Sequence, residues 1–208
     1  MAASRFLRRI GLAALSAGLL VTPATAGDAE GRYAPKGAGL MPCQVFLQQL
    51  QSQQPDAAGV AIVWLTGYLS AANAFLDDTY DLVTWQNDGI LANVLATRCA
   101  QNPNRPIAAA ANEVVQALGA GRLKTAEQPE RIKVGEREMV LYPSVIRQLQ
   151  QALKDNGQNI VVDGDFGPGT SNAIKAYQAS KGIPQSGFPD ALTMIGLFTG
   201  QVPQAPAP

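Results

Sequence analysis

The sequence predicts a mainly α-helical protein built from two helical modules. Between residues 42 and 118, apolar side chains recur at the three- and four-residue spacing that is typical of helices. Between residues 143 and 199, apolar helical stripes alternate with glycine-rich turns. The 208 residues suffice for one domain of average size or two small ones, and the aliphatic content suffices for compact cores.

The first 26 residues have the pattern of a secretory signal peptide. Three arginines precede an apolar run over residues 10–21, Pro23 ends that run, and residues 24–26 fit the small-x-small cleavage pattern. We therefore expect a mature chain that begins at Gly27, a periplasmic or secreted location, and no membrane span after cleavage. An uncleaved membrane anchor is the alternative, although the run is short for a membrane-spanning helix.

The charge and composition argue against several classes of function. The chain carries 16 basic and 16 acidic residues, and removal of the signal leaves 13 basic against 16 acidic. This acidic excess is the opposite of what a nucleic-acid-binding protein needs. The chain contains no histidine, so neither a histidine-activated nucleophile nor a histidine metal site is possible. We expect no nucleic-acid partner, no cofactor and no metal.

The two cysteines, Cys43 and Cys99, are expected to form a disulfide. An isolated pair in an exported protein is usually oxidised, and closing so long a loop stabilises the fold by about 4 kcal/mol on the chain-entropy model. The alternatives are a metal site or a reactive thiol. Two cysteines without histidine make a poor zinc set, and neither lies in a C-x-x-C motif.

The N-terminal module, residues 42–118, is expected to form four helices. Pro42 suits a first helical position, Asp56 can cap the second helix, and Pro106 suits the first turn of the fourth. The expected ranges are 42–54, 57–76, 89–100 and 106–118.

The second of these helices carries small residues at four-residue intervals. Gly59, Val63, Gly67 and Ala71 form a smooth strip, and each glycine costs about 1 kcal/mol of helix propensity relative to alanine. That cost suggests a packing reason, and the strip is smooth enough for another helix to approach it closely.

The remaining segments outside the helical patterns are shorter. Residues 119–140, rich in charge with Gly119, Gly121 and Pro129, are interpreted as a linker that contains short strand-like stretches at 131–134 and 139–141. Residues 200–208 are rich in Pro, Ala and Gln and are interpreted as a disordered tail.

The strongest motif lies in the C-terminal module, residues 141–199. An apolar stripe that includes Val145 and Leu149 is followed by the glycine-rich turn 163–170, in which Thr170 is expected to cap the next helix. A shorter echo follows at 187–193. The glycine-to-threonine spacing is the same in both turns, and Leu149-Gln150 is echoed by Tyr177-Gln178, so the module contains a weak internal repeat.

These residues resemble the peptidoglycan-binding domain that accompanies many cell-wall hydrolases. The family pattern is roughly V-x-x-L-Q-x-x-L, D-G-x-F-G-P-x-T and A-I-K-x-Y-Q. The chain follows it at 145–153, with one additional residue between Val145 and Leu149, and at 163–170 and 173–178. Ser186 departs from it, because the family usually has an acid before the second turn's glycine. The resemblance implies a three-helix bundle with a shallow groove near the turns and peptidoglycan as the partner.

The resemblance also implies which side chains would contact the ligand, and most of these have a purely structural alternative. Phe166 and Tyr177 can stack on a sugar or belong to the core, and Asp163 can accept ligand hydrogen bonds or brace the turn. The candidate contacts are Asp163, Gly164, Asp165, Phe166, Gly167, Thr170, Asn172, Tyr177 and Gln178.

The N-terminal module resembles small periplasmic helical proteins of the HdeA acid-stress chaperone type. The resemblance lies in Cys43-x-x-Phe46-Leu47, in Trp64-Leu65-x-Gly67-Tyr68 and in the second cysteine near the module's end. Secreted immunity proteins that protect the envelope from wall hydrolases share the cysteine and Gly-Tyr pattern. An acid chaperone would need carboxylates whose protonation loosens the fold, and the candidates are Asp77, Asp78, Asp81 and Asp88.

These observations favour a non-catalytic protein that is tethered to the cell wall. A lytic glycosidase needs positioned carboxylic acids and a larger fold, and the adjacent Asp77 and Asp78 would point apart. We expect the C-terminal module to bind peptidoglycan and the N-terminal module to contact an envelope protein or client. The alternatives are an acid-stress chaperone held at the wall, or an inhibitor or immunity protein against a wall hydrolase.

Overall fold

The computed structural model describes residue 28 and residues 32–52 and 58–202. The chain divides into two compact units, residues 1–34 and 35–208. Within the described part of the first unit, Arg32 Nε donates to Asp28 Oδ2 at 2.9 Å. The predicted signal peptide and most of the predicted tail lie outside the described residues. Among the helices described, none combines the length and the apolar character that a membrane crossing requires.

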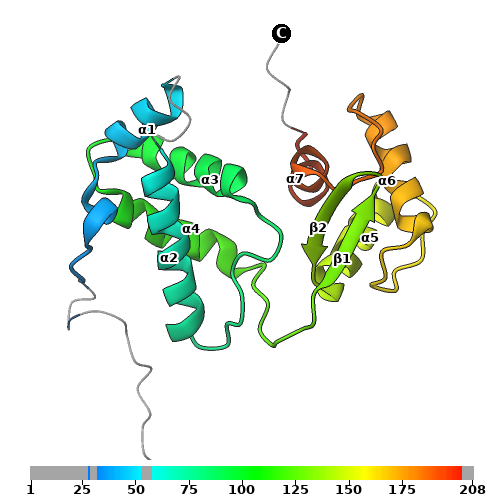
Figure 1. The fold of residues 1–208 in the computed structure, drawn as a ribbon, viewed down its shortest axis with the longest axis horizontal. Coiled ribbons are helices and arrows are strands. Elements are labelled where there is room, and N and C mark those ends of the chain that lie inside the picture. The colour runs from blue at the N-terminus through cyan, green and yellow to red at the C-terminus, as the bar shows by residue number, and fades with distance from the viewer. Residues whose placement is uncertain (1–27, 29–31, 53–57, 203–208) are drawn as a thin grey trace, which may run out of the picture. The chain divides into compact units, whose positions relative to one another are not determined.

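The second unit is mainly helical, as the sequence predicts (Figure 1). The N-terminal module opens with a short 3-10 helix, and four α-helices follow it. A two-stranded hairpin and three further α-helices complete the unit. The elements of the N-terminal module are η1 (Gly37–Leu40), α1 (Cys43–Gln51), α2 (Gly59–Phe75), α3 (Asp88–Gln101) and α4 (Ile107–Gly119).

A single apolar core holds the N-terminal module together. Leu65 of α2, Leu95 of α3 and Val114 of α4 are fully buried in it, because each lies on the apolar stripe of its helix. The predicted disulfide between Cys43 and Cys99 is present and joins α1 to α3. This module is therefore both packed and covalently closed.

Among the residues that the structure describes, no helix packs on the small strip of α2. No atom of these residues lies within 4 Å of the position that a Cβ would take at Gly59 or at Gly67, and Val63 between them is exposed. The expectation of close helix packing on this strip is wrong, because the opposite side of α2, with Ala61 and Leu65, faces the core. The close approach occurs at Gly39 of η1 instead, where a Cβ would lie 2.3 Å from the Trp64 ring.

The segment that we interpreted as a linker contains an antiparallel β-hairpin. Strands β1 (Glu130–Val134) and β2 (Arg137–Leu141) pair so that Ile132 lies opposite Met139. Ile132 and Leu141 are buried in the core of the C-terminal helices. The hairpin therefore extends the C-terminal domain beyond the region in which the sequence shows its helical motif.

Three helices form the rest of the C-terminal domain, as the resemblance implies. They are α5 (Pro143–Asp155), α6 (Pro168–Ser180) and α7 (Ala191–Thr199), and Ile146, Leu149 and Ile174 are fully buried between them. The expectation that Thr170 caps α6 is wrong. Gly167 is the N-cap and Pro168 takes the first turn, a position that suits proline because its missing N–H needs no partner there.

The loop between α2 and α3 packs against the C-terminal domain. Tyr142, at the N-terminus of α5, donates its hydroxyl to Asp81 Oδ2 at 3.0 Å. The Trp85 ring lies 5.2 Å from the Phe198 ring of α7, measured between centroids. Through these contacts, an aromatic residue of the N-terminal module covers part of the C-terminal core.

Candidate ligand-binding site

Two buried glutamines organise the C-terminal domain. Gln150 lies on α5 and Gln178 on α6, and both side chains are almost completely inaccessible to solvent. A buried amide must find hydrogen-bond partners, because leaving its groups unsatisfied costs about 1–3 kcal/mol each. Each glutamine finds these partners in one of the two glycine turns.

Gln150 holds the first turn. Its Nε2 donates to Asp163 Oδ1 at 2.8 Å, to the Asp165 carbonyl at 2.9 Å and to Thr170 Oγ1 at 3.1 Å. Its Oε1 accepts the backbone N–H of Asp163 at 3.0 Å and of Gly164 at 2.8 Å. One side chain thus forms hydrogen bonds with groups at both ends of the turn that precedes α6.

Gln178 holds the second turn with the same pattern. Its Nε2 donates to Ser186 Oγ at 3.2 Å, to the Phe188 carbonyl at 3.1 Å and to Thr193 Oγ1 at 2.9 Å. Its Oε1 accepts the backbone N–H of Gly187 at 2.9 Å. The internal repeat of the sequence is therefore a repeat of hydrogen bonds as well.

Ser186 takes the structural part that Asp163 plays in the first turn. Asp163 Oδ1 accepts the backbone N–H of Asp165 at 3.0 Å, and Ser186 Oγ accepts the backbone N–H of Phe188 at 3.2 Å. The serine therefore preserves the turn and removes the negative charge at this position.

The glycines of both turns are required by backbone conformation and by space. Gly164 has φ +87° and Gly187 has φ +69°, a left-handed region that other residues enter at a cost. A Cβ at Gly164 would lie 2.7 Å from Arg147 Cζ, and one at Gly187 would lie 2.6 Å from Ser171 Oγ. Both turns therefore pass close under a side chain of a neighbouring helix.

The carboxylate of Asp163 is held in its ionised form. The backbone N–H of Asp165 and the side-chain amide of Gln150 both donate to it and keep its pKa below the ordinary value. The side chain remains exposed to solvent, so the turn presents a stable negative charge at neutral pH.

A groove of about 350 Å³ lies beside the first turn. It is lined by four of the predicted site residues, together with Gln150, Gly169 and three residues that sequence reasoning missed. Of those three, Val161 is exposed although it is apolar. Its position just before the Asp-Gly turn is the sequence feature that could have indicated a place in the groove. The predicted residues in the groove are Asp163, Asp165, Gly167 and Thr170, and the missed ones are Asn159, Ile160 and Val161.

Other predicted contacts lie away from the groove surface. We expected Tyr177 and Gln178 to reach a ligand, and the structure places both in the interior, where Gln178 is fully used by the second turn. Phe166 is half-buried and packs on the core. Asn172 is exposed on α6 but does not line the groove.

Gly164 and Thr170 stabilise the first turn and contribute little to its surface. Both are buried, and both are hydrogen-bonded to Gln150. The charged groups that the first turn leaves accessible are the Asp163 and Asp165 carboxylates.

The C-terminal domain is therefore a helical bundle with two glutamine-held turns and an open groove beside the first turn. Residues 143–195 match the family model described as "Putative peptidoglycan binding domain". The matched span contains α5, α6 and both glutamine-held turns. This match supports a role in peptidoglycan binding, and the family is a binding domain rather than a catalytic one. No curated protein and no solved structure matches the chain, and the HdeA-type resemblance of the N-terminal module stays a prediction.

Proposed function

We propose that this chain is an exported, non-catalytic protein that binds peptidoglycan through its C-terminal domain and so holds its N-terminal module at the cell wall. The observation that carries the proposal is the family match, which falls on the segment that forms both turns and their shared core. The signal-like N-terminus and the disulfide support a periplasmic location.

The groove beside the first turn has the chemistry to bind the glycan strand. Asp165 presents an exposed carboxylate that can accept hydrogen bonds from sugar hydroxyls, and Asn159 adds an amide. Val161 provides an apolar surface for an N-acetyl methyl group. Gln150 fixes the backbone beneath these groups, so little ordering is needed on binding.

Co-sedimentation with purified insoluble peptidoglycan tests the proposal. We expect the full chain to pellet in a saturable manner and Val161→Asp to bind about tenfold more weakly, because covering one valine contributes about 1.5 kcal/mol. Val63→Asp on α2 is the matched control, since both valines have the same exposed fraction of 73% and both variants add one negative charge. A chain that stays in the supernatant at every salt concentration and pH would exclude wall binding.

The N-terminal module is the proposed interaction part, and a second candidate function rests on it. Val60, Val63 and Phe75 of α2 are 64%, 73% and 82% exposed, respectively, which is a large apolar exposure for one helix. Such a face suits a client of an acid chaperone or a hydrolase that the module inhibits. A rise in apolar-dye binding near pH 2–3 would favour the chaperone, and a stable complex with a wall hydrolase would favour the inhibitor.

A further inference from the structure

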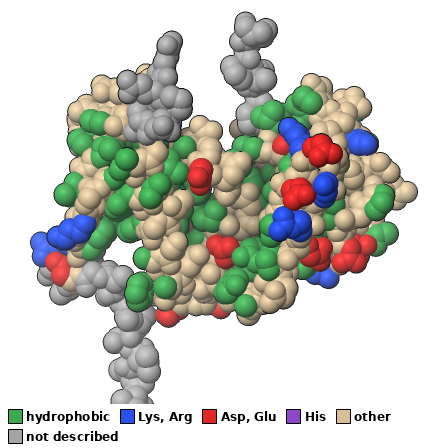
Figure 2. All heavy atoms as spheres, in the orientation of Figure 1, with side chains coloured by type: hydrophobic (Ala, Val, Ile, Leu, Met, Phe, Trp, Pro, Cys, Tyr) green, Lys and Arg blue, Asp and Glu red, His purple; other side chains and the backbone are tan. Residues whose placement is uncertain are grey.

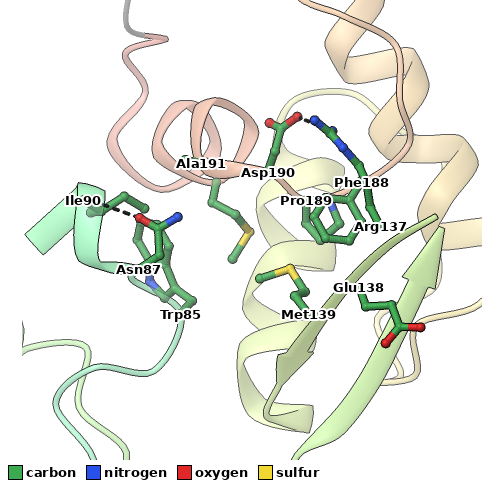
Figure 3. A pocket seen from close by; sticks show the side chains of 11 residues that line it. Trp85, Asn87, Ile90, Arg137, Glu138, Met139, Phe188, Pro189, Asp190 and Ala191 are labelled. Atoms are coloured by element: carbon green, nitrogen blue, oxygen red, sulfur yellow. Dashed lines mark hydrogen bonds and ion pairs between the residues drawn. The ribbon is translucent and has the colours of Figure 1, made fainter. Parts of the chain in front are cut away.

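A second groove lies where the N-terminal module meets the C-terminal domain. Its volume is about 420 Å³. Its residues come from the loop before α3 and the first turn of that helix, from β2, and from the second glycine turn and the start of α7 (Figure 3). The apolar part of its wall includes Trp85, Ile90, Met139, Phe188, Pro189 and Met194. Six of its residues lie outside the segment that matches the peptidoglycan-binding family: Trp85, Asn87 and Ile90 of the N-terminal module, and Arg137, Glu138 and Met139 of the hairpin.

Arg137 is fixed at the rim of this groove. Its Nη1 donates to Asp190 Oδ2 at 3.3 Å, and its guanidinium lies 5.5 Å from the centre of the Phe188 ring. The other oxygen of Asp190 accepts from the backbone N–H and hydroxyl of Thr193, at 3.1 and 2.7 Å. Asp190 is therefore fully engaged, while Arg137 keeps N–H groups for a further acceptor and is 56% exposed.

The other polar groups of the rim favour a ligand that accepts hydrogen bonds. Asn87 Oδ1 caps α3 by accepting from the Ile90 N–H at 3.0 Å, which fixes the side chain and leaves its amide nitrogen as a donor. Glu138 turns away from the groove in Figure 3 and contacts Arg131 at 3.1 Å and Lys133 at 3.5 Å. No unpaired acid among the described lining residues opposes an anionic ligand.

The surface around the hairpin does not select a ligand by its overall charge. Lys and Arg side chains alternate there with Asp and Glu (Figure 2). Recognition must therefore come from the fixed donors and the apolar wall of the groove. Arginine recognises carboxylates through charge-assisted hydrogen bonds, and an apolar wall accepts methyl and methylene groups.

We propose that this groove binds the stem peptide of peptidoglycan, with Arg137 and Asn87 donating to a stem-peptide carboxylate and Trp85 and Met139 covering its aliphatic part. The inference rests on the proposed function. It assigns the peptide and the glycan to different grooves, because the first turn presents carboxylates, whereas the second turn lies beside an arginine that the hairpin supplies.

Isothermal titration calorimetry of the full chain with the soluble tripeptide L-Ala-γ-D-Glu-meso-diaminopimelate tests the proposal. We expect saturable binding, with Arg137→Gln weakening it about tenfold or more because a charged hydrogen bond is lost. Arg131→Gln on the same hairpin is the matched control and should bind like the unaltered chain. Quenching of Trp85 fluorescence in a Trp64→Phe background should follow the same titration.

A second variant separates binding from folding. Ala191→Glu places a carboxylate at the first turn of α7, where negative charge stabilises a helix, while it repels the ligand's carboxylate. We expect unchanged or higher thermal stability and weaker tripeptide binding. Equal binding by the unaltered, Arg137→Gln and Ala191→Glu chains would overturn the proposal.

The two proposals fail in different ways. If the chain pellets with insoluble peptidoglycan but gives no heat with the tripeptide, wall binding stands and the stem-peptide site is overturned. If it neither pellets nor binds the tripeptide, both are overturned. Binding of an uncharged N-acetylglucosamine tetramer that Arg137→Gln abolishes would overturn the assignment of this groove to the peptide.

Discussion

The two glycine turns of the C-terminal domain share one scaffold and differ in surface chemistry. Each is held by a buried glutamine, contains a left-handed glycine near its start and ends on a threonine. The first turn exposes Asp163 and Asp165, whereas the second has the neutral Ser186 and lies near Arg137. Because the scaffold is buried and the differences are at the surface, a repeated fold can present two unlike binding sites.

Among the changes that test this comparison, removing a buried glutamine should reduce the stability of the domain most. Gln150→Leu leaves the N–H groups of Asp163 and Gly164 without their acceptor, and we expect a loss of about 3 kcal/mol or more in unfolding free energy. Gln178→Leu should be similarly destabilising. Guanidinium unfolding measures both changes.

The neighbouring Gln151 provides the control, because its side chain is exposed. Gln151→Leu should change stability by less than about 0.5 kcal/mol. A comparable loss in Gln151→Leu would contradict the bracing role that we assign to Gln150.

Alanine at the turn glycines should have the next largest effect. Gly164→Ala and Gly187→Ala each force a side chain into the left-handed region at about 1–2 kcal/mol, with an added clash. Gly169→Ala, on α6 in open space, should be neutral or stabilising. Thermal unfolding compares the three, and equal melting temperatures would show that the turns tolerate a Cβ.

Exchanging Asp163 and Ser186, the residues before the turn glycines, should change how the melting temperature depends on pH. The pKa of Asp163 is lowered in the fold, so its contribution is present above the ordinary carboxyl pKa and is lost as the pH falls through the lowered value. Asp163→Ser should therefore flatten the fall in melting temperature between pH 5 and pH 2, a window that spans the pKa of a free aspartate, about 4. Ser186→Asp should steepen it. Unchanged pH profiles in both variants would show that the carboxylate contributes nothing to the turn.

The smallest change in stability should come from removing the Tyr177 hydroxyl. Its hydroxyl is buried and has no hydrogen-bond partner in the part of the chain that the structure describes, and burial raises its pKa. Tyr177→Phe removes an unsatisfied group and should leave stability unchanged or raise it by about 0.5–1 kcal/mol. A clear loss, measured by guanidinium unfolding, would mean that the hydroxyl has a partner.

The sequence predicted what depends on local pattern. Helical spacing located the four N-terminal helices, the cysteine pair indicated the disulfide, and the glycine-to-threonine spacing revealed the repeat. It did not show that Gln178 is buried, because a polar residue on a helix is ordinarily exposed. The strip on α2 was misjudged for a different reason, since small residues indicate that close packing is possible and not where it occurs.

The second groove could not be predicted, because its residues meet only after the modules pack together. Trp85 and Arg137 are far apart in the sequence, and neither belongs to a motif. Arg137 also lies in a segment that composition alone marks as a linker. The contact between Trp85 and Phe198 that helps to place this groove depends on tertiary packing.

Mapping backbone amide shifts on binding tests the central claim most directly, namely that peptidoglycan is bound at the two turns of the C-terminal domain. Soluble peptidoglycan fragments would be titrated into the isotope-labelled full chain. We predict that the amide signals of residues 159–170 shift with glycan-containing fragments, and that those of residues 137–139 and 187–191 shift when a stem peptide is present. Shifts confined to α1–α4, or no shifts at saturating fragment, would contradict the account.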